Sequence, residues 1–440
     1  MSLTQEENDT LTRVGPGTPA GEMLRRYWQP AALIEELPTG GAPLPIRLLG
    51  EDLVLFRDEQ GYPGLLGIHC SHRGADLSYG RVEDGGLRCI YHGWLYDIAG
   101  RCLEQPGEPP GSSFHKRVRQ RAYPCREAGG MILAYMGPDE PPLVPAYEFL
   151  TVADEQRYNS KIFQECNYLQ ANEGNLDPVH VPFLHRIYAR HNGPPPSPAP
   201  QRVDITFDVE MTDWGVRLTR MDHPEPGVSH ARFTNFVFPN FSAIPAGSND
   251  GYTVNWHVPI DDEHHWKYVT VFRRDGPVDP EAVRRNRADL TDGYRLRRNR
   301  GNRYGQDREE MRTKTLLGIG TDFQDHDALA TEGEGAIQDR TQEHLASSDR
   351  AVVMIRHQLM QAIRQVQSGG EAPHVVRDPA ANHFPSLVVF GTTLPESADW
   401  RQHMREVIAA SERGEDPASV GADSGEGMHP MPNPSGRVWK

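Results

Sequence analysis

Four side chains that bind metals stand in two short clips of the sequence. The first clip, C-x-H, is Cys70 and His72, and the second, C-x2-H, is Cys89 and His92, after a gap of sixteen residues. A two-iron, two-sulfide cluster needs this mixed set when thiolates hold one iron and imidazoles the other. Because neutral imidazoles replace two thiolates, the reduction potential of such a cluster lies well above that of an all-cysteine cluster. The clips therefore predict an electron-transfer centre.

A zinc site is the main alternative for these four residues. Structural Cys2His2 zinc sites use similar spacings, but each of their clips usually holds two residues of one kind. The neighbouring glycines predict tight loops, in which backbone N–H groups can approach cluster sulfurs, rather than a finger helix. They are Gly74, Gly80, Gly85, Gly86 and Gly93. The respiratory class of these clusters has a further cysteine in each clip, but this sequence has Ala75 and Tyr91 at those positions. The difference argues against the respiratory class.

A second candidate metal site lies in CNYLQANEGNLDPVHVPFLHR, residues 166–186. Asp177 and His180 are three residues apart, so a helix would place them on one face. His185 follows five residues later, and the prolines of the segment could bend the helix so that it reaches the same centre. Two imidazoles and one carboxylate with open positions form the facial triad of Fe(II) oxygenases. The spacing alone also fits packing or surface histidines, but a cluster that supplies electrons favours an iron that consumes them.

The carboxylate of the triad must come from a distant segment. Residues 321–340 offer Asp322, Asp325 and Asp327, which the sequence alone does not separate. Asp327 is the preferred ligand because it lies five residues before Glu332 and directly before an apolar helical run. Asp325 is the alternative.

The elements that must position these residues belong to the α+β class. Short apolar or alternating runs over residues 45–145 predict a small all-β domain with both clips on hairpin loops. Five alternating segments over residues 202–275 predict one antiparallel sheet. Helices are expected over residues 17–29, 166–190, 338–366 and 397–411. The Pro-rich residues 191–200 are expected to form an extended surface loop, and the charged residues 280–315 a solvated face rather than an anion site.

These patterns divide the chain into four parts. Residues 1–44 are an N-terminal helix and lead-in, 45–150 the cluster domain, 151–411 the domain of the second iron, and 412–440 a tail. The tail is rich in Gly, Ser and Pro, so we expect it to be loosely ordered unless it docks on a neighbour.

Composition excludes several classes of protein. The 440 residues can form two or three domain-sized cores. No run of about eighteen apolar residues predicts a membrane span, and the polar N-terminus predicts neither a signal nor a transit peptide. Cys102, Cys125 and Cys166 form no disulfide framework, so a reducing cytoplasm is expected. The net charge of −15 argues against nucleic acid as a partner.

With both metal sites on one chain, the sequence resembles the Rieske non-haem iron ring-hydroxylating oxygenases. It is most similar to the α-subunits of the phthalate 4,5-dioxygenase and phenoxybenzoate dioxygenase branch. The matching motifs are CSHRGA and CIYHGW for the cluster, NYLQANEGNLDPVHVPFLH for the iron, and TRVGPGTPAGEMLRRYWQPAAL, RLLGEDLVLFRDEQG, VPIDDEHHW and QDRTQEHLASSDRAVV elsewhere. One departure lies at the carboxylate, because the family usually has Gln-Asp or Glu-Asp where this chain has His326-Asp327.

The resemblance implies an N-terminal Rieske 2Fe-2S domain, a C-terminal helix-grip catalytic domain, and homotrimers or stacked trimers. The implied ligands are Cys70, His72, Cys89 and His92 for the cluster, and His180, His185 and Asp327 for the mononuclear Fe(II). The cluster of one subunit would feed the iron of the next, and Asp177 would join His92 to His180. Asn167 and Glu173 match family positions with supporting roles. An NAD(P)H-dependent reductase with flavin and an iron-sulfur centre would supply the electrons.

The expected activity is O2-dependent dihydroxylation, monohydroxylation or O-demethylation of an aromatic substrate, and the branch favours aromatic carboxylates. A carboxylate needs a basic partner, ideally bidentate arginine. Arg220 and Arg232 on predicted strands are candidates, with ordinary surface arginines as the alternative. Phe233, Phe236 and Phe238 are expected to pack in the core, although one of them could line a pocket. A Rieske electron carrier without oxygenase activity is the alternative function.

Overall fold

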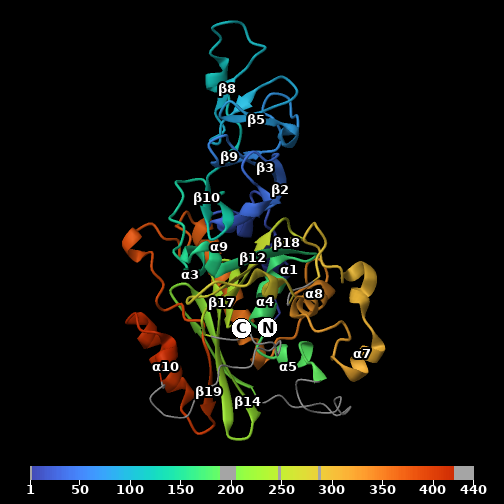
Figure 1. Ribbon diagram of the computed structural model, residues 1–440, viewed down its shortest axis with the longest axis vertical. Helices are drawn as coiled ribbons and strands as arrows, with labels where there is room; N and C mark the ends of the chain where they lie inside the picture. Colours follow the sequence, from blue (N-terminus) through green and yellow to red (C-terminus); the bar gives the residue numbers. More distant parts are fainter. Residues whose placement is uncertain (1, 189–204, 246–248, 286–288, 421–440) are drawn as a thin grey trace.

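The structure, a computed structural model, describes residues 2–188, 205–245, 249–285 and 289–420. The molecule is elongated, with a narrow β-rich part that carries β2 to β9 standing on a broader part that holds the large sheet and the helices (Figure 1). All five cysteines are free of disulfide bonds, which agrees with the prediction that Cys102, Cys125 and Cys166 form no disulfide framework. No helix among the described residues has both the length and the apolar character needed to span a bilayer.

The narrow part consists of two small antiparallel sheets. The first has the order β2 (Leu44–Leu48), β3 (Glu51–Arg57), β4 (Pro63–Gly67) and β9 (Ala122–Tyr123), and the second β5 (Arg81–Glu83), β6 (Gly86–Arg88), β7 (Leu95–Tyr96) and β8 (Cys102–Glu104). A separate core that includes Val54, Phe56, Leu66 and Leu87 lies between them. The second clip lies in the β6–β7 hairpin, as predicted, but the first clip is part of the connection between the two sheets.

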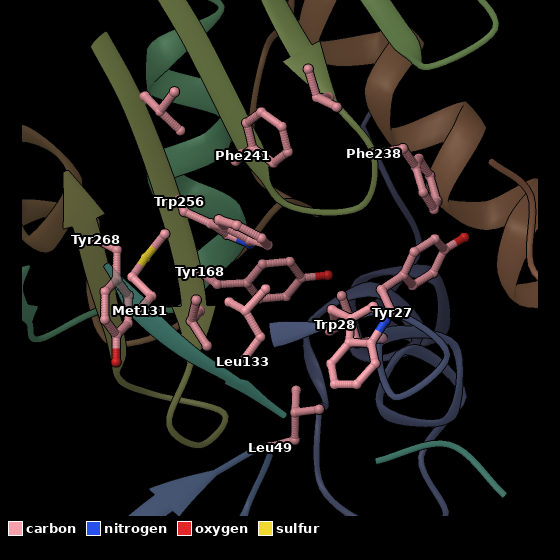
Figure 2. Close-up of a cluster of buried hydrophobic side chains, with 14 of the residues drawn as sticks. Tyr27, Trp28, Leu49, Met131, Leu133, Tyr168, Phe238, Phe241, Trp256 and Tyr268 are labelled. Atoms are coloured by element: carbon pink, nitrogen blue, oxygen red, sulfur yellow. The ribbon is translucent and has the colours of Figure 1, made fainter. Parts of the chain in front are cut away.

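A three-stranded sheet links the narrow part to the broad part. Its order is β1 (Gln29–Leu33), β11 (Met131–Ala134) and β10 (Cys125–Ala128). Met131 and Leu133 of β11 lie in one buried cluster with Trp28, Tyr168 and Trp256, which come from the N-terminal segment, a helix and the large sheet (Figure 2). The two parts of the molecule therefore share a continuous core at this link.

The broad part is built on one antiparallel sheet of eight strands. Seven follow the order β12 (Arg157–Gln164), β18 (His265–Phe272), β17 (Tyr252–Pro259), β16 (Phe241–Pro245), β15 (Val228–Val237), β14 (Gly215–Glu225) and β13 (Ile205–Met211), and β19 (Gly391–Pro395) pairs with β15. The five predicted segments are confirmed. The prediction missed β12, β16 and β19, of which β16 and β19 are only five residues long.

Ten helices are found in the described residues, several shorter than predicted. They are α1 (Gln5–Thr12), α2 (Pro19–Leu24), α3 (Glu148–Thr151), α4 (Tyr168–Asn175), α5 (Val181–Leu184), α6 (Pro280–Arg285), α7 (Arg308–Thr313), α8 (Phe323–Gly333), α9 (Arg350–Gln367) and α10 (Trp400–Glu412). Helix α4 packs against β17, α9 packs against β14, and α10 covers the other face of β14 and β15. An antiparallel sheet wrapped on helices is the predicted architecture, and it is confirmed.

Three predicted helices need correction. The prediction over 17–29 was too long, because Gln29 already begins β1. The prediction over 166–190 was wrong in its middle, where the chain leaves α4 before Pro178 and re-enters a helix at α5. The prediction over 338–366 began twelve residues too early, because residues 338–349 are held in irregular turns by side-chain contacts. Residues 191–200 and 421–440 lie outside the described residues.

Candidate cluster and iron sites

The two clips of the narrow part have the same backbone shape. The N–H of Gly74 donates to the carbonyl of Cys70 at 2.7 Å, and the N–H of Gly93 donates to the carbonyl of Cys89 at 3.0 Å. Both glycines have a φ of 74°, in the left-handed region where a side chain would be strained. Two turns of the same shape therefore direct the two cysteines toward each other. Both cysteines are buried.

The side chains of the clips sort into a thiol pair and an imidazole pair. The rings of His72 and His92 meet edge to face, with centroids 4.4 Å apart, and Trp94 stacks on His72 at 4.3 Å. Nδ1 of His72 is buried and has no hydrogen-bond partner among the described residues, although a buried ring nitrogen ordinarily has one. A metal on this nitrogen would supply the missing partner.

The spacing of the clip atoms argues against a single zinc ion. Within the described part of the chain, one group of three or more His, Cys, Asp or Glu has ligand atoms all within 4.8 Å of one another, and it is not in the clips. A tetrahedral zinc site would bring all four ligand atoms to one point. A cluster with separate sulfur-bound and nitrogen-bound irons does not require this, and the residues fit it.

The hydroxyl of Tyr96 contacts the sulfur of Cys70. The phenol oxygen of Tyr96 lies 3.2 Å from Sγ of Cys70 and 2.9 Å from the hydroxyl of Ser71. Burial raises the pKa of Tyr96 above its ordinary value, so the phenol stays protonated and can donate to the sulfur. Hydrogen bonds to cluster sulfurs are one of the determinants of the reduction potential.

The second site is formed where the chain leaves α4. His180 immediately precedes α5 and His185 immediately follows it, so this single helical turn holds the two rings with centroids 5.2 Å apart. Asp327 reaches them from α8, and its Oδ1 lies 3.1 Å from Nε2 of His185. His180, His185 and Asp327 form the group whose ligand atoms all lie within 4.8 Å. The structure thus brings together the three residues that the sequence singled out.

The protonation states of His180 and Asp327 suit a divalent cation. Burial lowers the pKa of His180, which Asp327 opposes only in part, so the imidazole is neutral near pH 7. Burial alone would raise the pKa of Asp327, but His185, and then Lys267, more than offset this and hold it well below its usual range. Neutral imidazoles and an ionised carboxylate are the forms that bind metal.

The structure separates the three candidate aspartates. Asp322 accepts a hydrogen bond from the N–H of Gln324 at 2.7 Å and thereby caps α8. The side chain of Asp325 faces Arg298, with Oδ2 3.8 Å from Nε. Only Asp327 has a helical phase that directs it to the histidines.

Sequence reasoning missed two polar residues in contact with the triad. The ammonium of Lys267, on β18, lies 3.7 Å from Oδ2 of Asp327. His326 places its Nδ1 3.2 Å from Nδ1 of His185, and burial lowers the pKa of His326 to about 4. The unusual His326-Asp327 pair was a sequence signal for His326, whereas nothing in the sequence marks Lys267.

Asp177 and His92 lie in different parts of the same chain. Asp177 contacts His180 through its backbone carbonyl, 2.7 Å from Nδ1, whereas its carboxylate Oδ2 is 4.0 Å from that nitrogen. His92 is exposed in the narrow part, and α5 lies in the broad part (Figure 1). The bridge from Asp177 to the cluster therefore stays a prediction about two subunits.

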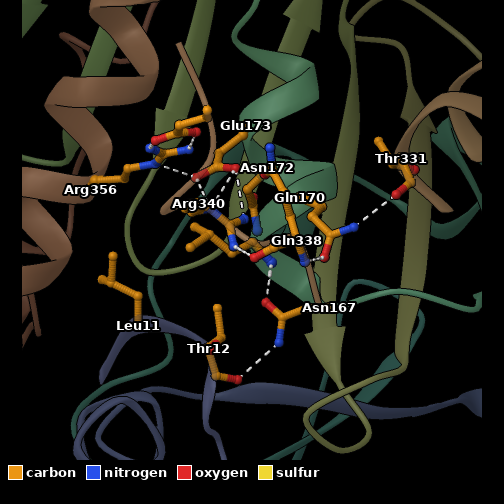
Figure 3. A network of polar contacts seen from close by, with 12 residues as sticks. Leu11, Thr12, Asn167, Gln170, Asn172, Glu173, Thr331, Gln338, Arg340 and Arg356 are labelled. Carbon is orange, nitrogen blue, oxygen red and sulfur yellow. Dashed lines mark hydrogen bonds and ion pairs between the residues drawn. The ribbon is translucent and has the colours of Figure 1, made fainter. Parts of the chain in front are cut away.

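Asn167 and Glu173 fix helix α4 at its two ends (Figure 3). The side chain of Asn167 accepts from the N–H of Leu169 and donates to the carbonyls of Thr12 and Asp262, at 2.9 and 2.7 Å. Glu173 receives Arg340 through three hydrogen bonds of 2.8 to 3.2 Å, and Arg356 at 2.6 Å. Both residues act on the helix that leads to His180.

Arg220 and Arg232 are directly opposite each other on β14 and β15. Paired residues share a face of the sheet, and following the pairs across β16 and β17 shows that this face also carries Lys267. Both guanidinium groups have a buried Nε that finds no partner in the part of the chain that the structure describes. Burial, and then the charge of Arg220, lowers the pKa of Arg232 to about 10. Phe233, Phe236 and Phe238 are buried in the core, as predicted.

Comparison with known proteins places the chain in a family. Residues 27–124 match the family described as Rieske 2Fe-2S domain, and residues 134–420 match the family described as LigXa C-terminal domain like. Phthalate 4,5-dioxygenase oxygenase subunit of Pseudomonas putida is 35% identical over 93% of this chain and 96% of its own length. Phenoxybenzoate dioxygenase subunit alpha of Ectopseudomonas oleovorans is 36% identical over 85% of this chain and 87% of its own length.

A solved structure has the same fold. The reduced complex between oxygenase and ferredoxin in carbazole 1,9a-dioxygenase superposes with a TM-score of 0.53 at 20% identity, over 80% of this chain and 93% of the other. The chain therefore belongs to the Rieske non-haem iron oxygenases, as an oxidoreductase of the oxygenase-subunit type. Within them it resembles the phthalate and phenoxybenzoate branch. It carries a Rieske 2Fe-2S domain, and His180, His185 and Asp327 are a possible site for the mononuclear iron that these oxygenases hold in the catalytic domain.

Proposed function

We propose that this protein is the terminal oxygenase of a multicomponent Rieske system that hydroxylates or O-demethylates an aromatic carboxylate. Cys70, His72, Cys89 and His92 would hold the cluster, and His180, His185 and Asp327 the mononuclear Fe(II). The observation that carries the proposal is the convergence of the three triad residues from two distant segments, within 4.8 Å. A Rieske electron carrier would have no need of this second site.

The donor set agrees with an oxygen-activating iron rather than with a structural metal. Two imidazoles and one carboxylate leave coordination positions open, and a bound Fe(II) would supply O2 activation there. The protein side chains hold the metal, orient the substrate and exclude water. The stacking of Phe323 on His185, with ring centroids 4.1 Å apart, places an apolar ring beside the site.

The arginine pair supports a carboxylate substrate. Like charges directly opposite each other on neighbouring strands destabilise a sheet. Arg220 contacts Asp222 at 3.3 Å, and among the described residues Arg232 donates to the carbonyl of Pro245 alone, at 3.4 Å. A bound carboxylate would balance the two charges and accept hydrogen bonds from the unpartnered Nε atoms. The names of the phthalate and phenoxybenzoate relatives point to substrates of the same chemical class.

Electrons would reach the cluster from a separate protein and then pass between subunits. The structural relative was solved as a complex of oxygenase and ferredoxin, which supports a redox partner of this kind. We propose an NAD(P)H-dependent reductase as the source and a homotrimer, or stacked trimers, as the working unit. In it, His92 of one subunit would face Asp177 of the next.

The activity is tested by incubating the purified protein with a surrogate reductase, NADH, 18O2 and a panel of benzoates, methoxybenzoates and phenoxybenzoates. We expect 18O in the product, or release of formaldehyde from a methoxy substrate. His180→Ala combined with His185→Ala should abolish product while the cluster is still reduced. Cluster reduction without oxygenation of any substrate by the wild type would favour the electron-carrier alternative.

The role of the arginines is tested by comparing each accepted carboxylate with its methyl ester. Arg232→Gln removes a charge-assisted hydrogen bond of about 1.5–3 kcal/mol, so KM for the acid should rise roughly tenfold to a hundredfold. KM for the ester should hardly change. Arg401→Gln is the matched control, because Arg401 is an exposed arginine that pairs with Asp208 on the surface. Equal effects of Arg232→Gln on acid and ester would contradict carboxylate recognition.

A further inference from the structure

His326 is a buried residue that contacts the candidate iron site without belonging to the triad. It directly precedes Asp327 in α8, and its ring lies nearly parallel to that of His185, at an angle of 16° with centroids 5.4 Å apart. The two Nδ1 atoms are 3.2 Å apart. On its other side, Nε2 of His326 lies 3.1 Å from the carbonyl oxygen of Gly320. These contacts form a chain from Gly320 through His326 to His185.

When both imidazole rings are neutral, this row of contacts allows only one placement of their ring protons. A carbonyl oxygen can only accept, so Nε2 of His326 carries the proton and Nδ1 of His326 holds the lone pair. The contact between the two Nδ1 atoms is then a hydrogen bond only if Nδ1 of His185 donates. This leaves the lone pair of His185 on Nε2, 3.1 Å from Oδ1 of Asp327, so that two acceptor atoms face each other and a cation can bind to both.

We propose that His326 is a positioning residue of the iron site, which fixes the tautomer and the ring plane of His185 so that Nε2 faces the metal. This inference rests on the proposed function of the triad. A different group fixes the ring of His180 in the same way. The backbone carbonyl oxygen of Asp177 lies 2.7 Å from Nδ1 of His180. Partners of this kind on a ligating histidine control both its orientation and its basicity.

The neutral ring of His326 also limits how strongly His185 donates to the metal. An anionic carboxylate in the same place would withdraw the Nδ1 proton further and make Nε2 a stronger base. A neutral imidazole acceptor withdraws this proton less and leaves Nε2 of His185 a weaker base. Removal of the acceptor leaves Nδ1–H of His185 buried without a partner, which favours the other tautomer and turns a protonated nitrogen to the metal.

The test measures Fe(II) binding by the full-length protein with its cluster in place. Competition with a chelator gives the Fe(II) dissociation constant, and the EPR spectrum of the nitric oxide adduct reports the symmetry at the iron. His326→Leu should weaken Fe(II) binding about 10–100-fold and change the EPR line shape. His326→Gln, whose amide oxygen can accept from His185, should restore most of both. His403→Leu, a half-buried histidine on α10, is the matched control and should change neither.

The outcomes separate this inference from the function on which it rests. If His326→Leu binds Fe(II) within twofold of wild type with an unchanged EPR spectrum, the positioning role is wrong and the triad stands. If His326→Gln is as impaired as His326→Leu, the acceptor role is also wrong, since only ring packing would then matter. If His185→Ala binds Fe(II) as well as wild type does, the triad itself is not the iron site.

Discussion

Substitution of Glu173 by Gln should destabilise the protein and loosen the candidate iron site. Glu173 joins α4 to Arg340 and Arg356, and its side chain is 8% exposed while that of Arg340 is fully buried. Arg356 also pairs with Glu343, but among the described residues Arg340 has no ion pair other than that with Glu173. The variant therefore leaves one buried guanidinium without an anion (Figure 3).

The size of this effect follows from the cost of an uncompensated buried charge. Removing one partner of a buried ion pair costs about 3–5 kcal/mol. For a folding unit of this size, 1 kcal/mol corresponds to roughly 2–4 °C in Tm, so Tm should fall by about 10 °C. Glu343→Gln is the matched control and should cost less, because Arg356 keeps Glu173.

The destabilisation should depend on pH. Burial alone would raise the pKa of Glu173, but Arg340 and Arg356 more than offset this, and the pKa lies below its ordinary value. For a carboxylate with a lowered folded-state pKa, the stabilisation is fully present above the unfolded pKa of about 4.3 and is lost as pH falls through the folded value. The difference between wild type and Glu173→Gln should therefore be constant from pH 6 to 8 and shrink below about pH 4.

The assay is thermal unfolding at several pH values, combined with Fe(II) retention and the visible spectrum of the cluster. We expect lower Tm, faster loss of the mononuclear iron and an unchanged cluster spectrum, since α4 leads to His180 while the clips lie in the narrow part. A Tm within about 2 °C of wild type at pH 7, with full iron retention, would refute the reasoning that this network anchors the site.

Three further substitutions test other parts of the structure. Tyr96→Phe removes a donor from the sulfur of Cys70, so the cluster potential in protein-film voltammetry should fall by about 40 mV if the bond favours the reduced form by about 1 kcal/mol; an unchanged or higher potential would rule this out. Asp177→Asn should keep the cluster spectrum but stop single-turnover electron transfer to the second iron, and normal turnover would exclude the intersubunit bridge. Asn167→Ala removes a helix cap and two hydrogen bonds to backbone carbonyls, so unfolding free energy should fall by about 2–4 kcal/mol; a loss below about 0.5 kcal/mol in denaturant titrations would contradict this anchoring.

The sequence was sufficient for those features that depend on local spacing. Clips of one Cys and one His, closed by a glycine, follow directly from the residue pattern, as do the long alternating strands β14, β15 and β17. The same holds for His180 and His185, because one helical turn between them is short enough for local geometry to decide. The domain bounds 45–150 and 151–411 stay predictions.

The features that sequence reasoning missed depend on distant contacts. The irregular turns of residues 338–349 are imposed by Arg340 and Glu343, whose partners lie on α4 and α9. Lys267 belongs to the site only because β18 places its side chain next to Asp327 of α8. The sequence preferred Asp327 but kept Asp325 as the alternative, because no local signal fixed the start of α8 at Phe323 to within one residue.

The number of iron atoms per chain, with and without the two histidines, tests the central claim most directly. Iron and acid-labile sulfide should be measured on wild type and on the His180→Ala, His185→Ala double variant. The wild type should hold about three irons and two sulfides per chain, two irons in the cluster and one in the triad. The double variant should hold about two irons and the same sulfide. A double variant that keeps the third iron, or a fully loaded wild type with only two, would contradict the assignment of the triad as the mononuclear iron site.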